Sequence, residues 1–258
     1  MRTLLLTLLL TNAAVAQETK PLRALLITGG CCHDYDKQKV ILTEGIASRA
    51  NVKFTIVQEG GTTTNHRVSL YEKADWADAF DVIVHNECFS VITDEEFVER
   101  VCAAHRNGKP GVMLHCSMHT FRDIQSDRWR ECLGVTTRRH EKQHPLDVKT
   151  IKSEHPIMKG FPAVWKTGDE ELYMVEKLWT TAEPLAQAFG VDTQKDHVCV
   201  WTNSYGKGRI FGSTLVHHAH HMERPEYLDL VTRGLLWSCN KLDDSGKPVA
   251  GYGPVAAK

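Results

Sequence analysis

The sequence predicts an α/β fold in which a mostly parallel central sheet is covered by helices on both faces. Short apolar runs alternate with helical patterns, and short glycine-rich turns connect them, which is typical of a parallel sheet. Of the 258 residues, 42% are hydrophobic, which is enough for one large core. No internal repeat or strong linker divides the sequence, so we expect a single domain over residues 22–242.

The first half of this domain alternates strands with helices. Strands are predicted where apolar and β-branched residues run together, at 23–28, 52–58, 81–85 and 111–115. Helices are predicted at 37–50, near 74–79, and between the acidic cap Thr93-Asp94-Glu95-Glu96 and Asn107-Gly108. This order builds strand–helix–strand units, and those units favour parallel pairing.

The second half has more strands and fewer helices. Strands are predicted at 147–151, 171–175 and 184–189, followed by a hairpin of 198–201 and 210–214. A closing helix is predicted over 225–239 because apolar residues recur along it. The residues after it are rich in Gly, Pro and Ser, so we expect 243–258 to form a flexible tail.

The first 16 residues have the three parts of a signal peptide. A basic start, Met1-Arg2, precedes an apolar run over 4–10 and the small-residue site Ala14-Val15-Ala16. The apolar run is shorter than the roughly 20 residues that span a bilayer. We therefore expect a periplasmic or secreted chain that starts near Gln17 and has no membrane span. A buried N-terminal strand or helix is the alternative interpretation.

Charge and cysteine content limit the classes of partner and bridge. The formal net charge is −1, so nothing favours a nucleic-acid partner. Eight cysteines raise the question of disulfides in an exported chain, but their spacing matches no compact framework. We expect one or two bridges without identifying them. Adjacent Cys31 and Cys32 lie in a predicted turn, where a bridge between them would be strained.

Polar residues directly after the predicted strands are the best candidates for a site. In an open α/β sheet, ligands bind beyond the carboxyl ends of the strands. Four segments meet this criterion, and each contains histidine. They are residues 29–34, 85–87, 115–119 and 217–221.

Histidines at several strand ends suit two chemistries, and the sequence leaves both open. Neutral imidazoles bind zinc or a similar divalent metal, with a carboxylate such as Glu170 as a further ligand. A histidine with a pKa near neutral can instead act as a general acid or base. No spacing is a strong metal motif, because His115 and His119 share a face only if their segment is helical. For any single histidine, a structural or surface role is the alternative.

Cys116 is the rival centre. It directly follows a predicted buried strand, where α/β hydrolases place a nucleophile, and the neighbouring His115 and His119 are of the kind that lowers a thiol pKa. The nucleophile turn normally has glycine two residues to either side, and Leu114 and Met118 stand there instead. This departure favours a small packed cysteine.

A series of short motifs makes the chain resemble the trehalose-utilisation (ThuA-like) family over residues 25–242. The motifs are Ile27-Thr28-Gly29-Gly30 with His33-Asp34, 111–115, His144-Pro145, His155-Pro156-Ile157, Glu170-Glu171-Leu172-Tyr173, 205–209, 215–217 and 233–237. The sequence departs from the family at Val216, where glycine is usual, and at Cys31-Cys32, where small residues are usual.

The resemblance implies a flavodoxin-like, three-layer fold of the class I glutamine amidotransferase type and a role in carbohydrate catabolism. Carried over by position, it implies catalytic roles for His33, His115, Glu171 and His217. A metal set of His33, His115, His144 and His217 is expected at the same place. Residues expected to bind substrate are Asp34, Asn86, Cys116, His119, Arg122, Glu170, Tyr173 and His218.

We therefore expect an enzyme that hydrolyses or eliminates at the glycosidic link of a glycoside or 3-keto-glycoside. A divalent metal such as zinc is the expected cofactor, and no nucleotide is expected. The alternatives are a non-catalytic carbohydrate-binding or accessory protein and a hydrolase that depends on Cys116. The expected partner is a small carbohydrate, and a homo-oligomer is compatible with the sequence.

Overall fold

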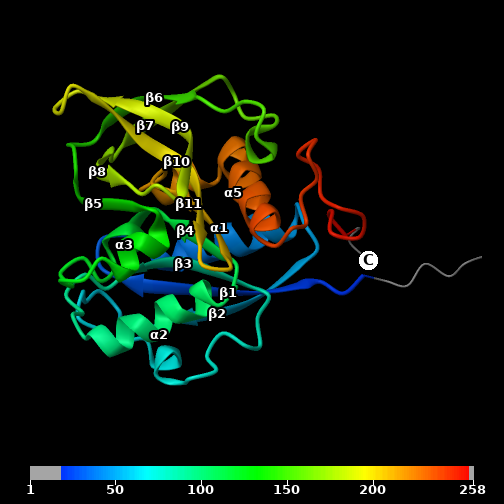
Figure 1. The fold of residues 1–258 in the computed structure, drawn as a ribbon. Coiled ribbons are helices and arrows are strands. Elements are labelled where there is room, and N and C mark those ends of the chain that lie inside the picture. Colours follow the sequence, from blue (N-terminus) through cyan, green and yellow to red (C-terminus); the bar gives the residue numbers. More distant parts are fainter. Residues whose placement is uncertain (1–18, 256–258) are drawn as a thin grey trace, which may run out of the picture.

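The computed structural model describes residues 19–255, so the expected signal peptide over 1–16 lies outside the described residues. Its main sheet has the strand order β2-β1-β3-β4-β11-β10-β9-β6-β7, and Figure 1 shows helices on both sides of it. The predicted α/β class is thereby confirmed. No helix within the described range is long and apolar enough to cross a membrane.

The parallel half of the sheet contains the strands predicted in the first half of the sequence. β1 (Leu22–Gly30) lies between β2 (Val52–Gln58) and β3 (Val82–Cys88), and β3 pairs with β4 (Gly111–Leu114). β11 (Gly208–Ser213) continues this half by pairing in parallel with β4. The carboxyl ends of β1, β4 and β11 therefore lie along one edge of the sheet.

The other half of the sheet is antiparallel and brings the second half of the sequence to this edge. Beyond β11 lie β10 (Lys195–Tyr205), β9 (Ala182–Gly190), β6 (His144–Thr150) and β7 (Val164–Glu170). A separate two-stranded sheet is formed by β5 (Val135–His140) and β8 (Tyr173–Leu178).

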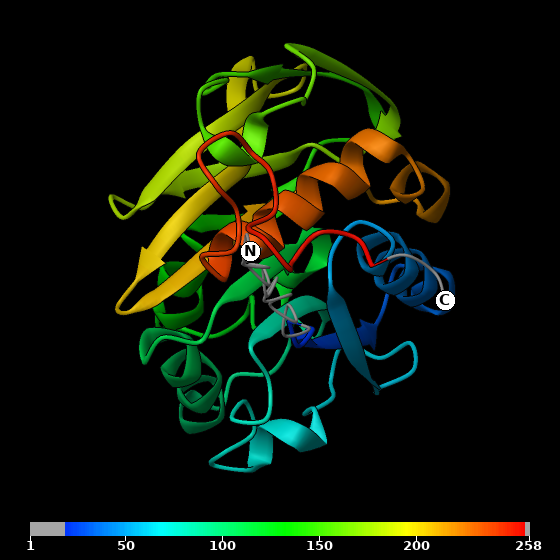
Figure 2. The ribbon, with the colours of Figure 1, turned by 90° about the vertical axis from the view of Figure 1, so that its right-hand side faces the viewer.

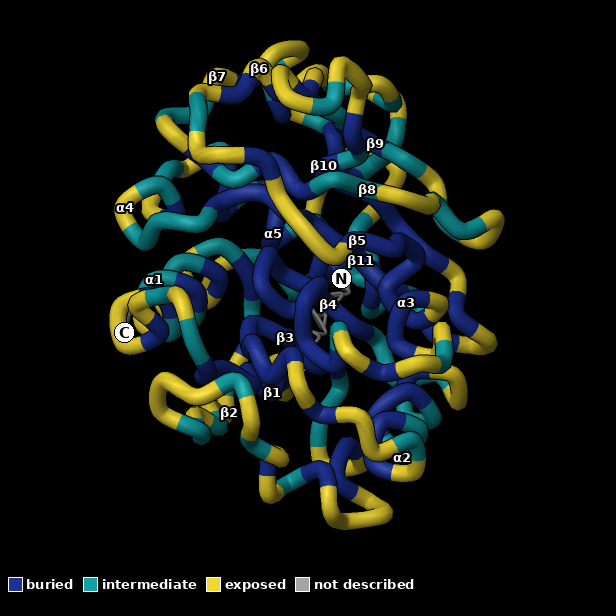
Figure 3. Tube along the Cα trace, turned by 90° about the vertical axis from the view of Figure 1, so that its left-hand side faces the viewer, coloured by how far each residue is buried: buried dark blue, intermediate teal, exposed yellow. Residues whose placement is uncertain are grey.

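Helices cover the two faces of the sheet as separate layers (Figure 2). α1 (Tyr35–Ala47) and α5 (Pro225–Ser238) contribute to one core cluster, and α2 (Glu95–Arg106) and α3 (Arg128–Leu133) contribute to the other. Figure 3 shows the central strands as a buried band between them. Short helices occur at η1 (Ser69–Glu72), η2 (His115–His119), η3 (Pro156–Met158) and α4 (Ala219–Met222).

Two segments differ from the simple sequence pattern. The stretch 74–79 is a series of turns instead of a helix, because so short a segment makes too few hydrogen bonds to offset helix nucleation. The segment after Asp243 lies against the domain: the Asn51 side-chain amide donates to the Gly251 carbonyl at 2.9 Å, and the Val249 N–H donates to the Lys241 carbonyl at 2.9 Å. The flexibility of this segment stays a prediction.

The packing of α5 on β11 depends on Gly234. A Cβ built on Gly234 would lie 2.4 Å from the ring of buried Phe211. Alanine is normally the better helix residue by about 1 kcal/mol. Here we expect Gly234→Ala to lower the free energy of unfolding by about 1–3 kcal/mol, because the ring has no space to move. Urea denaturation measures this change.

The matched control is Gly45→Ala in α1. A Cβ at Gly45 would meet the methyl ends of Leu228 at 2.7 Å, and these can rotate away, so we expect a smaller loss. A Gly234→Ala variant as stable as the native chain would contradict the close approach of α5 to the sheet.

Candidate metal centre

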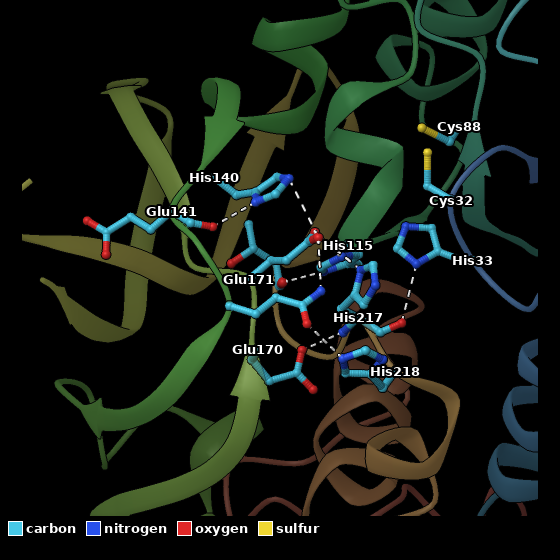
Figure 4. A network of polar contacts seen from close by, with 12 residues as sticks. Cys32, His33, Cys88, His115, His140, Glu141, Glu170, Glu171, His217 and His218 are labelled. Atoms are coloured by element: carbon cyan, nitrogen blue, oxygen red, sulfur yellow. Dashed lines mark hydrogen bonds and ion pairs between the residues drawn. The ribbon is translucent and has the colours of Figure 1, made fainter. Parts of the chain in front are cut away.

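Three of the predicted histidines converge where the carboxyl ends of β1, β4 and β11 meet. His33 follows β1, His115 is the first residue after β4, and His217 lies in the segment that leaves β11. One ring nitrogen from each lies within 4.8 Å of those of the other two. Figure 4 shows the three rings grouped beside Glu171. We call His33, His115 and His217 the histidine triad.

Backbone carbonyls orient two of these rings. His115 Nδ1 lies 2.6 Å from the carbonyl oxygen of Thr214, and His33 Nδ1 lies 3.3 Å from that of His217. Because a carbonyl only accepts, each Nδ1 donates its hydrogen. Burial, together with the neighbouring His115 and His217, lowers the pKa of His33 to about 3. His33 is therefore a neutral imidazole at neutral pH.

Glu171, in the loop between β7 and β8, adds a carboxylate to the triad. Its Oε2 lies 3.2 Å from His217 Nδ1 and 3.4 Å from His115 Nε2. Both of these nitrogens are buried and have no hydrogen-bond partner among the described residues. Burial by itself would raise the pKa of Glu171, but the two imidazoles outweigh it and hold that pKa well below its usual range. The carboxylate is therefore ionised.

These donors fit a divalent cation. A carboxylate oxygen and ring nitrogens of three imidazoles face one small space, and a metal ion bound there would satisfy all of them together. Imidazole nitrogen with carboxylate oxygen is a ligand set of zinc and related metals. Metal-bound imidazoles usually donate their second ring N–H to a carbonyl or carboxylate, as His33 and His115 do to carbonyls. The triad is therefore the candidate ligand set, with Glu171 beside it.

Residues behind the triad hold His217 in place. Gln38 Nε2 donates to the His217 carbonyl at 3.1 Å, and Asn86 Nδ2 donates to Gln38 Oε1 at 3.1 Å. From the other side, Glu170 Oε2 accepts the His217 backbone N–H at 2.6 Å, and Glu170 Oε1 contacts His221 Nδ1. Asn86 and Glu170 were expected to bind substrate or metal. Both are buried, and their hydrogen bonds instead position the triad.

The backbone is strained on both sides of the triad. His115 has a φ of 37° and Val216 a φ of 75°, a left-handed region that residues other than glycine rarely adopt. For Val216 this conformation explains why the family that the sequence resembles usually has glycine at this position. For His115, the strained turn after β4 is where hydrolytic α/β folds present a nucleophile. This chain presents an imidazole there.

A cavity of about 340 Å³ opens beside the triad, within the size range of small-ligand sites. One part of its wall consists of Cys31, Cys32, Cys88 and Cys116. Cys31 and Cys32 form a disulfide, contrary to the expectation from their adjacency, at a turn where Cys32 has a φ of 84°. Contact with Cys88 and burial raise the pKa of Cys116 far above its usual range, so this thiol stays protonated and is a poor nucleophile.

Another part of the wall is aromatic. The rings of His119 and Tyr173 stack with centroids 4.4 Å apart at 8°, and Tyr173 also approaches His115 at 4.8 Å. His119 Nε2 is buried without a hydrogen-bond partner in residues 19–255. Both residues line the cavity, as does Arg122, and the substrate-binding roles expected for them stay predictions.

Three expected site residues lie elsewhere. His144 does not join the triad: it begins β6, and its Nε2 lies 3.1 Å from Glu141 Oε2. Asp34 caps α1, where its Oδ1 accepts the Lys37 backbone N–H at 3.2 Å. His218 Nε2 contacts Gln143 Oε1 at 3.2 Å. The expected four-histidine metal set is therefore corrected to a set of three.

His140 is a site residue that the strand-end criterion did not select. It ends β5, lines the cavity, and places Nε2 3.6 Å from Glu171 Oε1. Its Nδ1 lies 2.8 Å from the Glu141 carbonyl and donates its hydrogen to it. The pairing of β5 with β8 brings His140 to the cavity, and no short-range pattern in the sequence indicates that pairing.

Comparisons with known proteins agree with this fold. A family model for trehalose utilisation (ThuA) matches residues 23–238. The chain is similar in structure to a ThuA-like protein of Parabacteroides merdae, with 18% identity, a TM-score of 0.69 and coverage of 91% of this chain and 97% of the other. It is also similar to a ThuA-like protein of Bacteroides uniformis, with 14% identity, a TM-score of 0.65 and coverage of 92% of this chain and 99% of the other.

A more distant likeness extends to the amidotransferase type of fold. A protein described as a GMP synthase component, from Thermoplasma acidophilum, has 11% identity and a TM-score of 0.52, covering 86% of this chain and 96% of its own. No curated protein matches the sequence. The flavodoxin-like fold implied by the motifs is thereby confirmed.

Glu141 stabilises the turn beside His140 and His144. Its carboxylate accepts hydrogen bonds from the Val191 and Thr193 backbone N–H groups and the Thr193 hydroxyl. Burial opposes ionisation, but these hydrogen bonds outweigh it and lower the pKa of Glu141 to about 2. Because this pKa lies below the ordinary value of 4.5, the carboxylate stabilises the fold above about pH 4.5, and this contribution is lost as the pH falls towards 2.

We therefore expect Glu141→Gln to lower the free energy of unfolding by about 1–3 kcal/mol near neutral pH. The difference in unfolding free energy between this variant and the native chain should shrink as the pH falls from 4.5 towards 2. Urea denaturation at a series of pH values measures it. A difference that stays constant over this range would show that ionised Glu141 does not stabilise the turn.

Proposed function

The chain belongs to the trehalose-utilisation (ThuA) family, and on that premise we propose that it is a metal-dependent enzyme that cleaves a 3-keto-glycoside or a related glycoside. The observation that carries the proposal is the convergence of the triad, with its ring nitrogens within 4.8 Å of one another and two of them buried without a partner in the described chain. Such unsatisfied groups are costly, so a ligand that satisfies them is the simplest reason for their placement.

His33, His115 and His217 would hold the metal, with Glu171 as the adjacent carboxylate. Nitrogen-rich ligation favours zinc or a similar divalent ion. When bound, such an ion supplies Lewis acidity towards a carbonyl oxygen of the substrate. In a 3-keto-glycoside that carbonyl acidifies the hydrogen on the neighbouring carbon C2.

The proton chemistry then falls to side chains that line the cavity. In an elimination, a base takes the C2 proton, the C–H electron pair forms a C1–C2 double bond, and the C1–O bond breaks with the pair leaving on oxygen. His140 lines the cavity, and its Nε2 lies 3.6 Å from ionised Glu171, which would stabilise the imidazolium that forms when Nε2 accepts a proton. We assign His140 as the base, and the imidazolium returns the proton to the leaving alcohol.

Two other functions have less support. A hydrolase that depends on Cys116 would need a thiolate, and the raised pKa of this buried thiol opposes it. A non-catalytic carbohydrate-binding protein would use the same cavity but has no need of three converging imidazoles. The signal-peptide pattern supports a location in the periplasm or outside the cell.

The test compares two chromogenic substrates, p-nitrophenyl 3-keto-β-D-glucoside and p-nitrophenyl β-D-glucoside. With zinc-loaded protein we expect nitrophenol release from the keto compound to be the faster of the two, because only its C2 hydrogen is acidified. His115→Ala should slow this release by about 100-fold or more, since loss of a single outer-shell partner of a metal already costs 10–100-fold.

His155→Ala is the matched control, because His155 packs against Trp237 and does not line the cavity. Its rate should equal that of the native protein. Equal release by the zinc-loaded, the chelator-treated and the His115→Ala proteins would rule out a metal-dependent reaction.

A further inference from the structure

The cavity beside the triad has a strongly cationic wall. Its lining includes Arg122, Arg138 and Arg139. Among the described residues that line the cavity, Glu171 is the one acidic residue. Arg138 and Arg139 lie near the end of β5, and Arg122 follows η2. The segment after η2 and the strand β5 therefore bring three arginines to the lining of one cavity.

Two of these guanidinium groups have no hydrogen-bond partner in the described chain. None of the hydrogen bonds or ion pairs within residues 19–255 uses the side chain of Arg139, and the nearest carboxylate to Arg122 is Asp123, with Nε and Oδ1 3.6 Å apart. Arg138 pairs with Glu176 on β8. Arginines outside the cavity usually have direct partners, as Arg23 has with Asp81 at 2.7 Å and Arg49 with Asp229 at 2.6 Å.

The arginines connect to the triad through the aromatic wall. Burial, and to a smaller extent the charge of Arg122, lower the pKa of His119 to about 3. His119 is therefore a neutral ring, and its Nε2 has no hydrogen-bond partner among the described residues. His119 stacks on Tyr173, and Tyr173 contacts His115. The lining of the cavity thus combines the three arginines, the neutral ring of His119, and His33 and Glu171 of the candidate metal centre.

We infer that the arginine wall is an anion subsite, and that the ligand of this cavity is an acidic sugar that bears a carboxylate or a phosphate ester. A neutral glycoside needs hydroxyl partners, for which His119 suffices, and gives no role to three cations. Guanidinium groups match planar or tetrahedral oxyanions with paired hydrogen bonds, and a concave wall concentrates their field. This inference rests on the proposed carbohydrate function and narrows its substrate class.

The test measures binding of D-glucuronate, glucose 6-phosphate and D-glucose to the zinc-loaded protein by isothermal titration calorimetry. We expect at least one acidic sugar to bind about tenfold more tightly than glucose, because a hydrogen bond to a charged group contributes about 1.5–3 kcal/mol. Which acid binds more tightly distinguishes a carboxylate from a phosphate ligand. Raising the salt concentration should weaken binding of the acids and leave glucose unchanged.

Arg139→Gln and Arg122→Gln should each remove most of the preference for the acid, with thermal stability unchanged. Arg128→Gln is the matched control, because Arg128 is exposed, pairs with Glu95 and Glu99, and lies outside the cavity lining. Its preference for the acid should equal that of the native protein.

Two outcomes would overturn the anion subsite. If glucose binds as tightly as both acids, or if the arginine variants keep the full preference, the subsite is wrong while the metal-dependent cleavage of a keto-glycoside still stands. If none of the three sugars binds to protein that has taken up zinc, the carbohydrate function fails together with the subsite.

Discussion

The backbone of His217 is the point on which the arrangement of the site depends. Its carbonyl accepts hydrogen bonds from Gln38 and from His33, and its N–H donates to Glu170. These contacts join α1, the end of β1 and the end of β7 to the segment after β11. These hydrogen bonds hold the backbone of the same residue whose ring belongs to the triad. Any change that moves the peptide groups of His217 therefore also moves a triad nitrogen. Val216, with its left-handed φ of 75°, turns the chain into this position.

The mixed sheet explains how distant parts of the sequence reach one place. Parallel pairing of β1, β3, β4 and β11 puts the ends that carry His33, His115 and His217 on one edge. The antiparallel half then folds back so that Glu171 faces the same three rings. The parallel half therefore supplies the imidazole nitrogens and the antiparallel half the carboxylate. The small sheet of β5 and β8 adds His140 and two arginines of the wall, Arg138 and Arg139.

The pattern of apolar runs in the sequence predicted most of the parallel half of the sheet, because buried strands are continuous apolar runs. It also indicated the triad, because the carboxyl ends of parallel strands lie at the same edge of the sheet. The same criterion could not separate residues that face the cavity from those behind it. Asn86 and Glu170 stand at strand ends, but their side chains form hydrogen bonds with Gln38 and the His217 backbone that hold the triad in place. His144 contacts Glu141 instead of the triad. His140 and Gln38 escaped prediction because their roles arise from tertiary contacts with Glu171 and the His217 carbonyl.

The central claim is that the triad, and not the neighbouring sulfur wall, binds a divalent metal. X-ray absorption spectroscopy of the zinc-loaded protein at the zinc edge tests it most directly, because nitrogen and sulfur ligands differ in distance. The claim predicts a shell of nitrogen and oxygen at about 2.0–2.1 Å with the outer scattering of imidazole rings. A shell at about 2.3 Å would place zinc on Cys88 or Cys116, and failure to retain zinc at all would equally contradict the claim.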